Sequence, residues 1–254
     1  MMQRRPAFPA RLDMPQAPTK GVPGAARPAQ SPTPQGVGLD SAAVRTRMVQ
    51  RLAASGIGAA SVLNAMGAVE RHRFVDSALV NQAYEDTSLP IGLGQTISKP
   101  SVVARMIELL LGADCARASG LGRVLEIGTG CGYQAAVLSR LAREVYTIER
   151  LRALHEKARD NLRPLRLANV HLILGDGMHG YAAGAPYAGI IAAASGDSIP
   201  DEWCAQLAVG GRLVAPMAAA DGRQLLLVVD KTPHGLKQSV LEAVHFVPLK
   251  SGVV

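Results

Sequence analysis

Short apolar segments alternate with helical segments through the middle of the chain, and this alternation limits the possible folds more than any other feature. The runs with the length of buried strands are residues 123–127, 145–148, 170–174, 187–192 and 212–215. The segments with helical spacing are residues 133–141, 151–162 and 201–207. Strands that alternate with helices form a parallel sheet with helices on both faces. We therefore predict an α/β fold with a doubly wound, Rossmann-like and mostly parallel sheet.

The segments on either side of this core predict two additions to it. Apolar residues recur at three- and four-residue steps over residues 44–69, which predicts an N-terminal helical cap. Residues 90–99 are rich in Gly, Thr and Ser and predict a loop, after which Pro100 can begin a helix. Two apolar runs at residues 224–230 and 240–247, joined by a turn-rich segment, predict a C-terminal antiparallel hairpin at the sheet edge.

Residues 1–38 differ in composition from the rest of the chain. They contain eight of the sixteen prolines and carry a net charge of +4, out of +7 for the whole chain. We predict that this Pro- and Arg-rich tail is disordered and that residues 39–254 form a single domain. Because most of the basic charge lies in the tail, the charge of the chain does not by itself indicate a nucleic-acid partner.

The composition also limits location and metal binding. No apolar run reaches the roughly 18 to 20 residues of a membrane-spanning helix, and the N-terminal region has no continuous apolar signal segment. The three cysteines lie far apart and the six histidines show no ligand spacing, so we expect no metal site. We expect a cytoplasmic monomer without a membrane partner.

The turn after the first core strand is rich in glycine, and doubly wound sheets bind ligands at such turns. Residues 126–132 read Glu-Ile-Gly-Thr-Gly-Cys-Gly, and Gly128, Gly130 and Gly132 allow the backbone to bend and to lie against a ligand. The spacing differs from the G-x-G-x-x-G of pyrophosphate-binding loops. Glu126, directly before the loop, would repel a pyrophosphate and attract a cation. The loop therefore favours a cationic ligand without phosphates.

Two further acids are expected at the same edge of the sheet. Glu149 closes the second strand about 20 residues beyond the first glycine, where a carboxylate can accept hydrogen bonds from both ribose hydroxyls. Asp176 follows the third strand, where it is either an ordinary turn residue or an acceptor near an adenine amino group. An adenosine that carries a sulfonium in place of a phosphate satisfies these features. The expected cofactor is therefore S-adenosyl-L-methionine.

Several short segments outside the glycine loop, spread over nearly the whole chain after the tail, match the sequence pattern of a known family. They are His-Arg-Phe-Val at 72–75, Ala-Tyr-Glu-Asp at 83–86, Leu-Pro-Ile-Gly at 89–92, Gly-Gln-Thr-Ile-Ser at 94–98 and Phe-Val-Pro-Leu at 246–249. With the glycine loop, they resemble protein-L-isoaspartate (D-aspartate) O-methyltransferase of the bacterial type. The loop is shared by many methyltransferases, whereas residues 89–98, placed ahead of the first core strand, are similar to that one family.

The resemblance implies a methyltransferase domain that acts on the free carboxylate of L-isoaspartyl and D-aspartyl residues. It implies that damaged proteins or flexible peptides are the partners, and that the methyl ester closes to a succinimide, which opens partly to normal aspartate. It also implies that Ser98 is the catalytic hydroxyl and that Thr96 positions the substrate. The residues expected at the cofactor, from the resemblance and from the argument above, are Gln95, Thr96, Ile97, Glu126, Gly128, Gly130, Gly132, Glu149, Asp176 and Gly177.

One stretch departs from the family pattern, which reads Thr-Ala-Ala-Pro or similar after the fourth strand. Here residues 193–197 read Ala-Ala-Ser-Gly-Asp, so Asp197 adds an acid where an anionic substrate is expected. The departure leaves a non-catalytic S-adenosylmethionine-binding protein as one alternative. A nucleic-acid methyltransferase is the other, but its Asn/Asp-Pro-Pro-aromatic motif is missing and an aromatic content of 4% offers few platforms for bases. We therefore expect no nucleic-acid partner.

Overall fold

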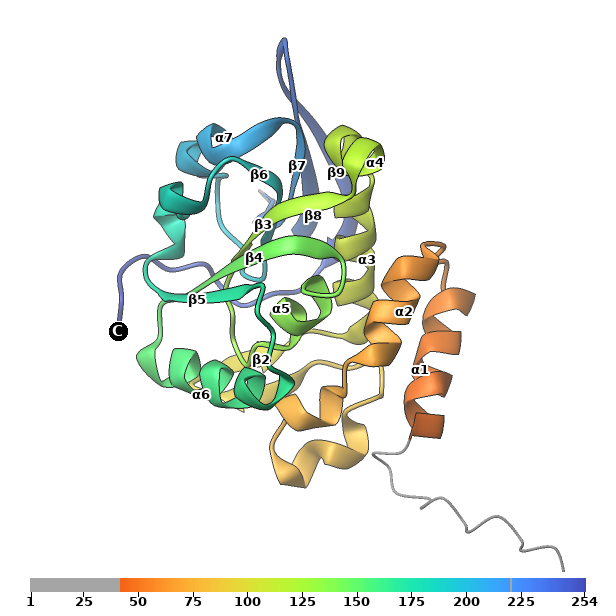
Figure 1. Cartoon of the computed structure of the whole chain (residues 1–254). Helices are drawn as coiled ribbons and strands as arrows, with labels where there is room; N and C mark the ends of the chain where they lie inside the picture. Colours follow the sequence, from red (N-terminus) through yellow and green to blue (C-terminus); the bar gives the residue numbers. More distant parts are fainter. Residues whose placement is uncertain (1–41, 220) are drawn as a thin grey trace, which may run out of the picture. The chain divides into compact units, whose positions relative to one another are not determined.

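The centre of the fold is a seven-stranded sheet in the order β5-β4-β3-β6-β7-β8-β9 (Figure 1). A computed structural model describes residues 42–219 and 221–254, so the predicted tail lies outside the described residues. Strands β3 to β7 run parallel to their neighbours, whereas β7-β8 and β8-β9 are antiparallel. The prediction of a mostly parallel sheet with an antiparallel hairpin at one edge is confirmed.

The helices and strands lie close to their predicted positions. The strands of the sheet are β3 (Leu121–Ile127), β4 (Ala142–Glu149), β5 (Val170–Leu174), β6 (Tyr187–Ala192), β7 (Leu207–Ala218), β8 (Gln224–Thr232) and β9 (Gly235–Val244). The helices are α1 (Ala42–Ala54), α2 (Ala60–Ala68), α3 (Pro100–Leu111), α4 (Asp114–Ser119), α5 (Tyr133–Leu138), α6 (Arg152–Leu162) and α7 (Asp201–Gln206). Within the described ranges, no helix is long and apolar enough to cross a membrane.

The central strands of the sheet are buried on both faces, which explains why β3 and β6 are nearly continuous apolar runs. Successive strand residues point to opposite faces. Val124 of β3 therefore packs into the core formed with α1 to α6, and Leu125 packs into the opposite core with Trp203 of α7. Helices α1 and α2 form the predicted N-terminal cap and pack beside α3 (Figure 1).

The predicted loop over residues 90–99 is instead largely a small hairpin. Strands β1 (Leu89–Gly92) and β2 (Gln95–Ile97) pair antiparallel, and their apolar residues Leu89, Ile91 and Ile97 are buried. The glycines that suggested a loop form the tight turn, in which both Gly92 and Gly94 have positive φ. The strands are too short for their alternation to be recognised in the sequence.

The C-terminal hairpin has a different second strand from the one predicted. The apolar run at 240–247 suggested its position, but β9 covers Gly235–Val244. Its first four residues are exposed, and they include Lys237 and Gln238, because β9 is the edge strand of the sheet. Pairing with β8 keeps them in the strand without apolar burial, and an apolar pattern does not reveal such residues.

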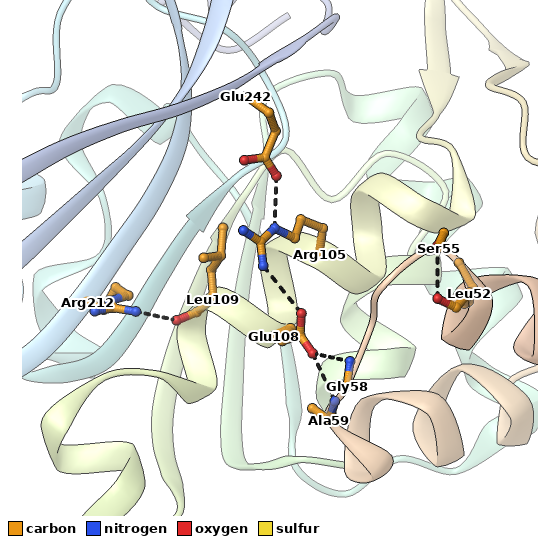
Figure 2. Close-up of polar contacts among 9 residues, drawn as sticks. All are labelled: Leu52, Ser55, Gly58, Ala59, Arg105, Glu108, Leu109, Arg212 and Glu242. Carbon is orange, nitrogen blue, oxygen red and sulfur yellow. Dashed lines mark hydrogen bonds and ion pairs between the residues drawn. The ribbon is translucent and has the colours of Figure 1, made fainter.

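A polar network joins the helical cap to the sheet (Figure 2). Glu108 of α3 accepts hydrogen bonds from the main-chain N–H groups of Gly58 and Ala59, both at 2.8 Å, just ahead of α2. Arg105, one turn earlier in α3, bonds to Glu242 of β9 at 2.8 Å and lies 3.4 Å from Glu108. Glu108 therefore caps α2 from a distance, since it accepts the N–H of the N-cap residue Ala59 and that of Gly58 before it.

We expect Glu108→Ala to lower the free energy of unfolding by about 1 to 2 kcal/mol, because two amides directly ahead of α2 lose their acceptor. Urea unfolding followed by circular dichroism measures this change. Glu242→Ala is the matched control, since it removes the other, more exposed carboxylate bound to Arg105 and should cost less than about 1 kcal/mol. Equal losses in the two variants would contradict the capping role.

Candidate active site

A cavity lies at the carboxyl ends of the parallel strands, between the sheet and the β1–β2 hairpin. Residues at the ends of β3, β4 and β6 line it, together with residues 95–98 of the hairpin segment. The sheet order reverses between β3 and β6, because β4 and β5 extend to one side and β7 to the other. Ligands of doubly wound sheets bind at this type of switch point.

The glycine loop forms the floor of this cavity. Gly128, Gly130 and Gly132 all have positive φ, which favours glycine at each position. The Gly128 N–H donates to the carbonyl of Ile148 at 2.9 Å, so the loop is tied to the end of β4. A Cβ on Gly130 would lie 3.2 Å from Ile91 of β1, so a side chain there would press against the hairpin.

Glu149, at the end of β4, is 5% exposed and lines the cavity. Its Oε2 accepts the N–H of Gly130 at 2.9 Å, and its Oε1 accepts the N–H of Leu151 at 3.0 Å. Each carboxylate oxygen retains a second lone pair. The carboxylate is therefore held in one orientation and can still accept hydrogen bonds from a ligand.

Glu126, at the end of β3, is fully buried and also lines the cavity. Its Oε2 accepts the hydroxyl of Thr147 at 2.5 Å, and the side chain of Gln134 also interacts with the carboxyl group, although Oε1 makes no hydrogen bond of good geometry among the described residues. Burial, with a smaller contribution from the Glu149 charge, raises the pKa of Glu126 to about 8. A buried acceptor without a partner costs free energy, which a cation or a donor in the cavity would offset.

The hairpin segment supplies the opposite wall. Gln95, Thr96, Ile97 and Ser98, which the resemblance implied for the reaction site, all line the cavity. Ser98 is half-buried, and its hydroxyl makes no hydrogen bond to another described residue. The main-chain carbonyl of Ser98 is fixed by Arg71, whose Nη2 donates to it at 2.8 Å. The Ser98 hydroxyl is thus free to bind a ligand while its backbone is held.

Two of the expected cofactor residues do not line the cavity. A Cβ on Gly132 would lie 3.0 Å from Leu162, so this glycine allows α6 to pack closely against the loop. Asp176 accepts the N–H of Met178 at 2.9 Å and the N–H of Gly252 at 2.6 Å. Gly177 does line the cavity, and the buried Trp203 holds its carbonyl at 2.8 Å. A role for Asp176 at the adenine stays a prediction.

The C-terminal segment forms a wall of the cavity that the sequence patterns did not predict. Residues 247–250 line it, and they are held because Ser195 pairs with Val247 at 2.8 Å and with Leu249 at 2.7 Å through main-chain bonds. The Phe-Val-Pro-Leu segment was part of the resemblance, but no spacing rule gives it a place in the site. Asp197, the extra acid, is exposed and does not line the cavity.

The fold and this cavity define a class. A glycine loop at the switch point, with one carboxylate held at the end of each of two adjacent strands and without the spacing of a pyrophosphate loop, is the arrangement of a Rossmann-like S-adenosylmethionine-dependent methyltransferase. The comparisons with known proteins identify the family within this class. The sequence profile of "Protein-L-isoaspartate(D-aspartate) O-methyltransferase (PCMT)" matches residues 43–254, and the chain belongs to this family.

Individual relatives agree with this assignment. The chain is 59% identical to the protein-L-isoaspartate O-methyltransferase of Methylibium petroleiphilum, over 97% of this chain and 96% of the relative. It is 62% identical to that of Leptothrix cholodnii, over 85% of this chain and 77% of the relative. A solved protein-L-isoaspartate O-methyltransferase matches with a TM-score of 0.73 and 29% identity, over 82% of this chain and 66% of that structure.

A second solved structure shares the fold at lower identity. It is a putative protein-L-isoaspartate O-methyltransferase from Plasmodium falciparum in complex with S-adenosyl-L-homocysteine. It matches with a TM-score of 0.70 and 23% identity, over 81% of this chain and 98% of that structure. The prediction of the family from the sequence is confirmed.

Proposed function

We propose that this chain transfers the methyl group of S-adenosyl-L-methionine to the free carboxylate of L-isoaspartyl and D-aspartyl residues in damaged proteins. The observation that carries the proposal is the meeting of two sets of residues in one cavity of a chain that belongs to this family. The glycine loop, Glu126 and Glu149 form one side, and residues 95–98 form the other. One cavity can therefore hold a methyl donor against an acceptor.

The residues on the loop side fit S-adenosyl-L-methionine, which when bound supplies an electrophilic methyl group on a sulfonium. Glu149 would accept hydrogen bonds from the ribose hydroxyls through its remaining lone pairs. Glu126, with its unpartnered buried oxygen, would face the cationic part of the cofactor. Gly128 and Gly130 leave the floor of the cavity without side chains, so that the cofactor can lie against the backbone.

The hairpin side would orient the acceptor. A carboxyl group with a pKa of about 4 is already ionised at neutral pH, so methyl transfer to it needs no general base. The demand is alignment, since reacting atoms must be held about 3 to 3.5 Å apart and in line. The hydroxyls of Ser98 and Thr96 would donate hydrogen bonds to the isoaspartyl carboxylate and hold it in place. The resulting ester would then close to a succinimide.

The preferred substrate is a flexible peptide segment, which can enter the cavity as extended chain. Asp197 does not argue against an anionic substrate, because its carboxylate is exposed and outside the cavity lining. Two cationic residues, Arg150 and Lys250, do line the cavity and would favour a carboxylate there. We further propose that the protein acts as a cytoplasmic monomer and does not use nucleic acid as a substrate.

Transfer of a labelled methyl group tests the proposal. The purified chain should methylate an isoaspartyl peptide, and should leave the same peptide with normal aspartate and a structured RNA unlabelled. Label on the RNA would favour a nucleic-acid methyltransferase. Cofactor binding without any transfer would favour the non-catalytic alternative.

We expect Glu149→Gln to weaken the binding of S-adenosyl-L-methionine about 5- to 30-fold, or about 1 to 2 kcal/mol, because charged hydrogen bonds to the ribose are lost. Isothermal titration calorimetry measures the dissociation constant. Glu144→Gln is the matched control, since Glu144 lies on the same strand but pairs with His171 outside the cavity. An unchanged dissociation constant in Glu149→Gln would remove this residue from the site.

A further inference from the structure

Arg71 is a fully buried arginine that binds both ends of the β1–β2 hairpin. Its Nη2 donates to the carbonyl of Ser98 at 2.8 Å and lies 3.5 Å from the carbonyl of Thr87. Thr87 precedes β1, and Ser98 directly follows β2. Its Nε donates to the carbonyl of Ala83 at 2.8 Å. One guanidinium therefore holds the segment before the hairpin, at Ala83 and Thr87, and the residue directly after it, Ser98.

The same guanidinium also contacts the cofactor side of the cavity. Its Cζ lies 4.8 Å from the centre of the Tyr133 ring, within the range of a cation–π interaction. Tyr133 is buried, lines the cavity and is the first residue of α5, directly after the glycine loop. Arg71 thus lies between the hairpin and the helix that begins at the loop.

The burial of Arg71 is costly for stability alone. An arginine stays charged in a protein, and no ion pair joins Arg71 to a carboxylate within the described part of the chain. An apolar residue of similar volume could fill the same space at a lower desolvation cost. The planar fork of donors, which neither an apolar residue nor lysine provides, is what connects the three carbonyls.

We propose that Arg71 is a positioning residue that sets the orientation of the Ser98 hydroxyl for methyl transfer. The inference rests on the proposed function and on the role of Ser98 in it. The bond from Nη2 fixes the peptide plane that follows Ser98, and the pairing of Ile97 with Leu89 holds the residue before it, so the backbone is held on both sides of the Ser98 side chain. The contact with Tyr133 holds this guanidinium against the cofactor side. Arg71 acts through Ser98 and does not itself line the cavity.

A double-mutant cycle tests this proposal. Wild type, Arg71→Lys, Ser98→Ala and the double variant are compared for kcat and KM on an isoaspartyl peptide, and for the dissociation constant of S-adenosyl-L-homocysteine. Arg71→Lys should lower kcat about 10- to 100-fold, since an ammonium cannot replace the fork and small misplacements are costly. In the Ser98→Ala background the same change should lower kcat less than about threefold, because the group through which Arg71 acts is gone. The dissociation constant should change less than about threefold in each variant.

Arg123→Lys is the matched control, because Arg123 also donates to two main-chain carbonyls, those of Gly184 and Ala185, but away from the cavity. It should keep wild-type kcat.

If circular dichroism shows that Arg71→Lys does not fold, Arg71→Gln, which keeps an amide donor, takes its place in the cycle. The proposal would be overturned if Arg71→Lys kept the kcat of wild type. It would also be overturned if the double variant lost kcat by the product of the two single-variant factors, because the residues would then act independently. An inactive wild-type chain would instead contradict the proposed function itself.

Discussion

The affinity for S-adenosyl-L-methionine is expected to rise as the pH increases from about 6 to about 8, by up to about tenfold per pH unit. In the ligand-free protein, burial raises the pKa of Glu126 to about 8, so this carboxyl group is mostly protonated at neutral pH. A cationic ligand in the cavity favours the carboxylate, so that binding releases a proton. Affinity must then increase with pH until Glu126 is ionised in the free protein as well.

Calorimetric titrations at several pH values, each in two buffers of different ionisation enthalpy, measure both the affinity and the released proton. Glu126→Gln should remove most of the pH dependence and the proton release. The amino group of the ligand titrates equally in the experiments with both proteins, so the difference between them isolates Glu126. A pH dependence that is the same in wild type and Glu126→Gln would contradict this role.

The same group makes a prediction for the stability of the ligand-free fold. A carboxyl pKa that is higher in the folded state means that folding takes up a proton between pH values of about 4.5 and 8. The stabilisation is therefore fully present below the unfolded-state pKa and is lost as the pH rises through the folded-state value. Wild type should lose stability relative to Glu126→Gln between these limits, as urea unfolding at each pH would show.

Ser98→Ala should lower turnover on an isoaspartyl peptide about 10- to 100-fold, as expected from the loss of one hydrogen bond of about 1.5 to 3 kcal/mol to a charged group. The affinity for the cofactor should change much less, since Glu149 and Glu126 lie on the other side of the cavity. A general base or a nucleophile at this position would give a far deeper loss, because the chemistry would then depend on the oxygen itself.

Ser101→Ala is the matched control for Ser98→Ala. The Ser101 hydroxyl is three residues away and binds Asp86 at 2.7 Å, outside the cavity lining. It should therefore keep wild-type turnover. Wild-type turnover in Ser98→Ala would end the catalytic assignment, and a loss confined to cofactor binding would move Ser98 to the cofactor side.

The sequence predicts the sheet well, and it predicts that Glu126, Glu149 and most of the glycine loop lie together at one edge of it, because both depend on local patterns. Strand length, helical spacing and the placement of Glu126 and Glu149 at strand ends can all be read along the chain. The carboxyl ends of parallel strands meet at one edge of the sheet, so residues distant in sequence could be placed together. The resemblance then predicted the hairpin residues that line the opposite wall.

The contacts that the sequence does not predict are non-local and mostly involve the main chain. Arg71 binds three carbonyls up to 27 residues away, and nothing in its sequence neighbourhood marks it as buried. Residues 247–250 reach the cavity only because Ser195 holds them through backbone bonds. The Asp176 carboxylate is likewise bound by a main-chain group, the N–H of Gly252. Main-chain donors and acceptors are present at nearly every residue, so their pairing leaves no pattern of residue types.

Selectivity for the isoaspartyl carboxylate over carboxylates in general distinguishes the proposed function from any other methyl transfer. A single flexible peptide that contains one normal aspartate and one isoaspartate, incubated with the protein and S-adenosyl-L-methionine, tests this directly. Tandem mass spectrometry at early times locates the methyl group. We expect a methyl ester on the isoaspartyl residue and none on the aspartyl residue. Methylation of both residues at similar rates, or a peptide that stays unmodified, would contradict it.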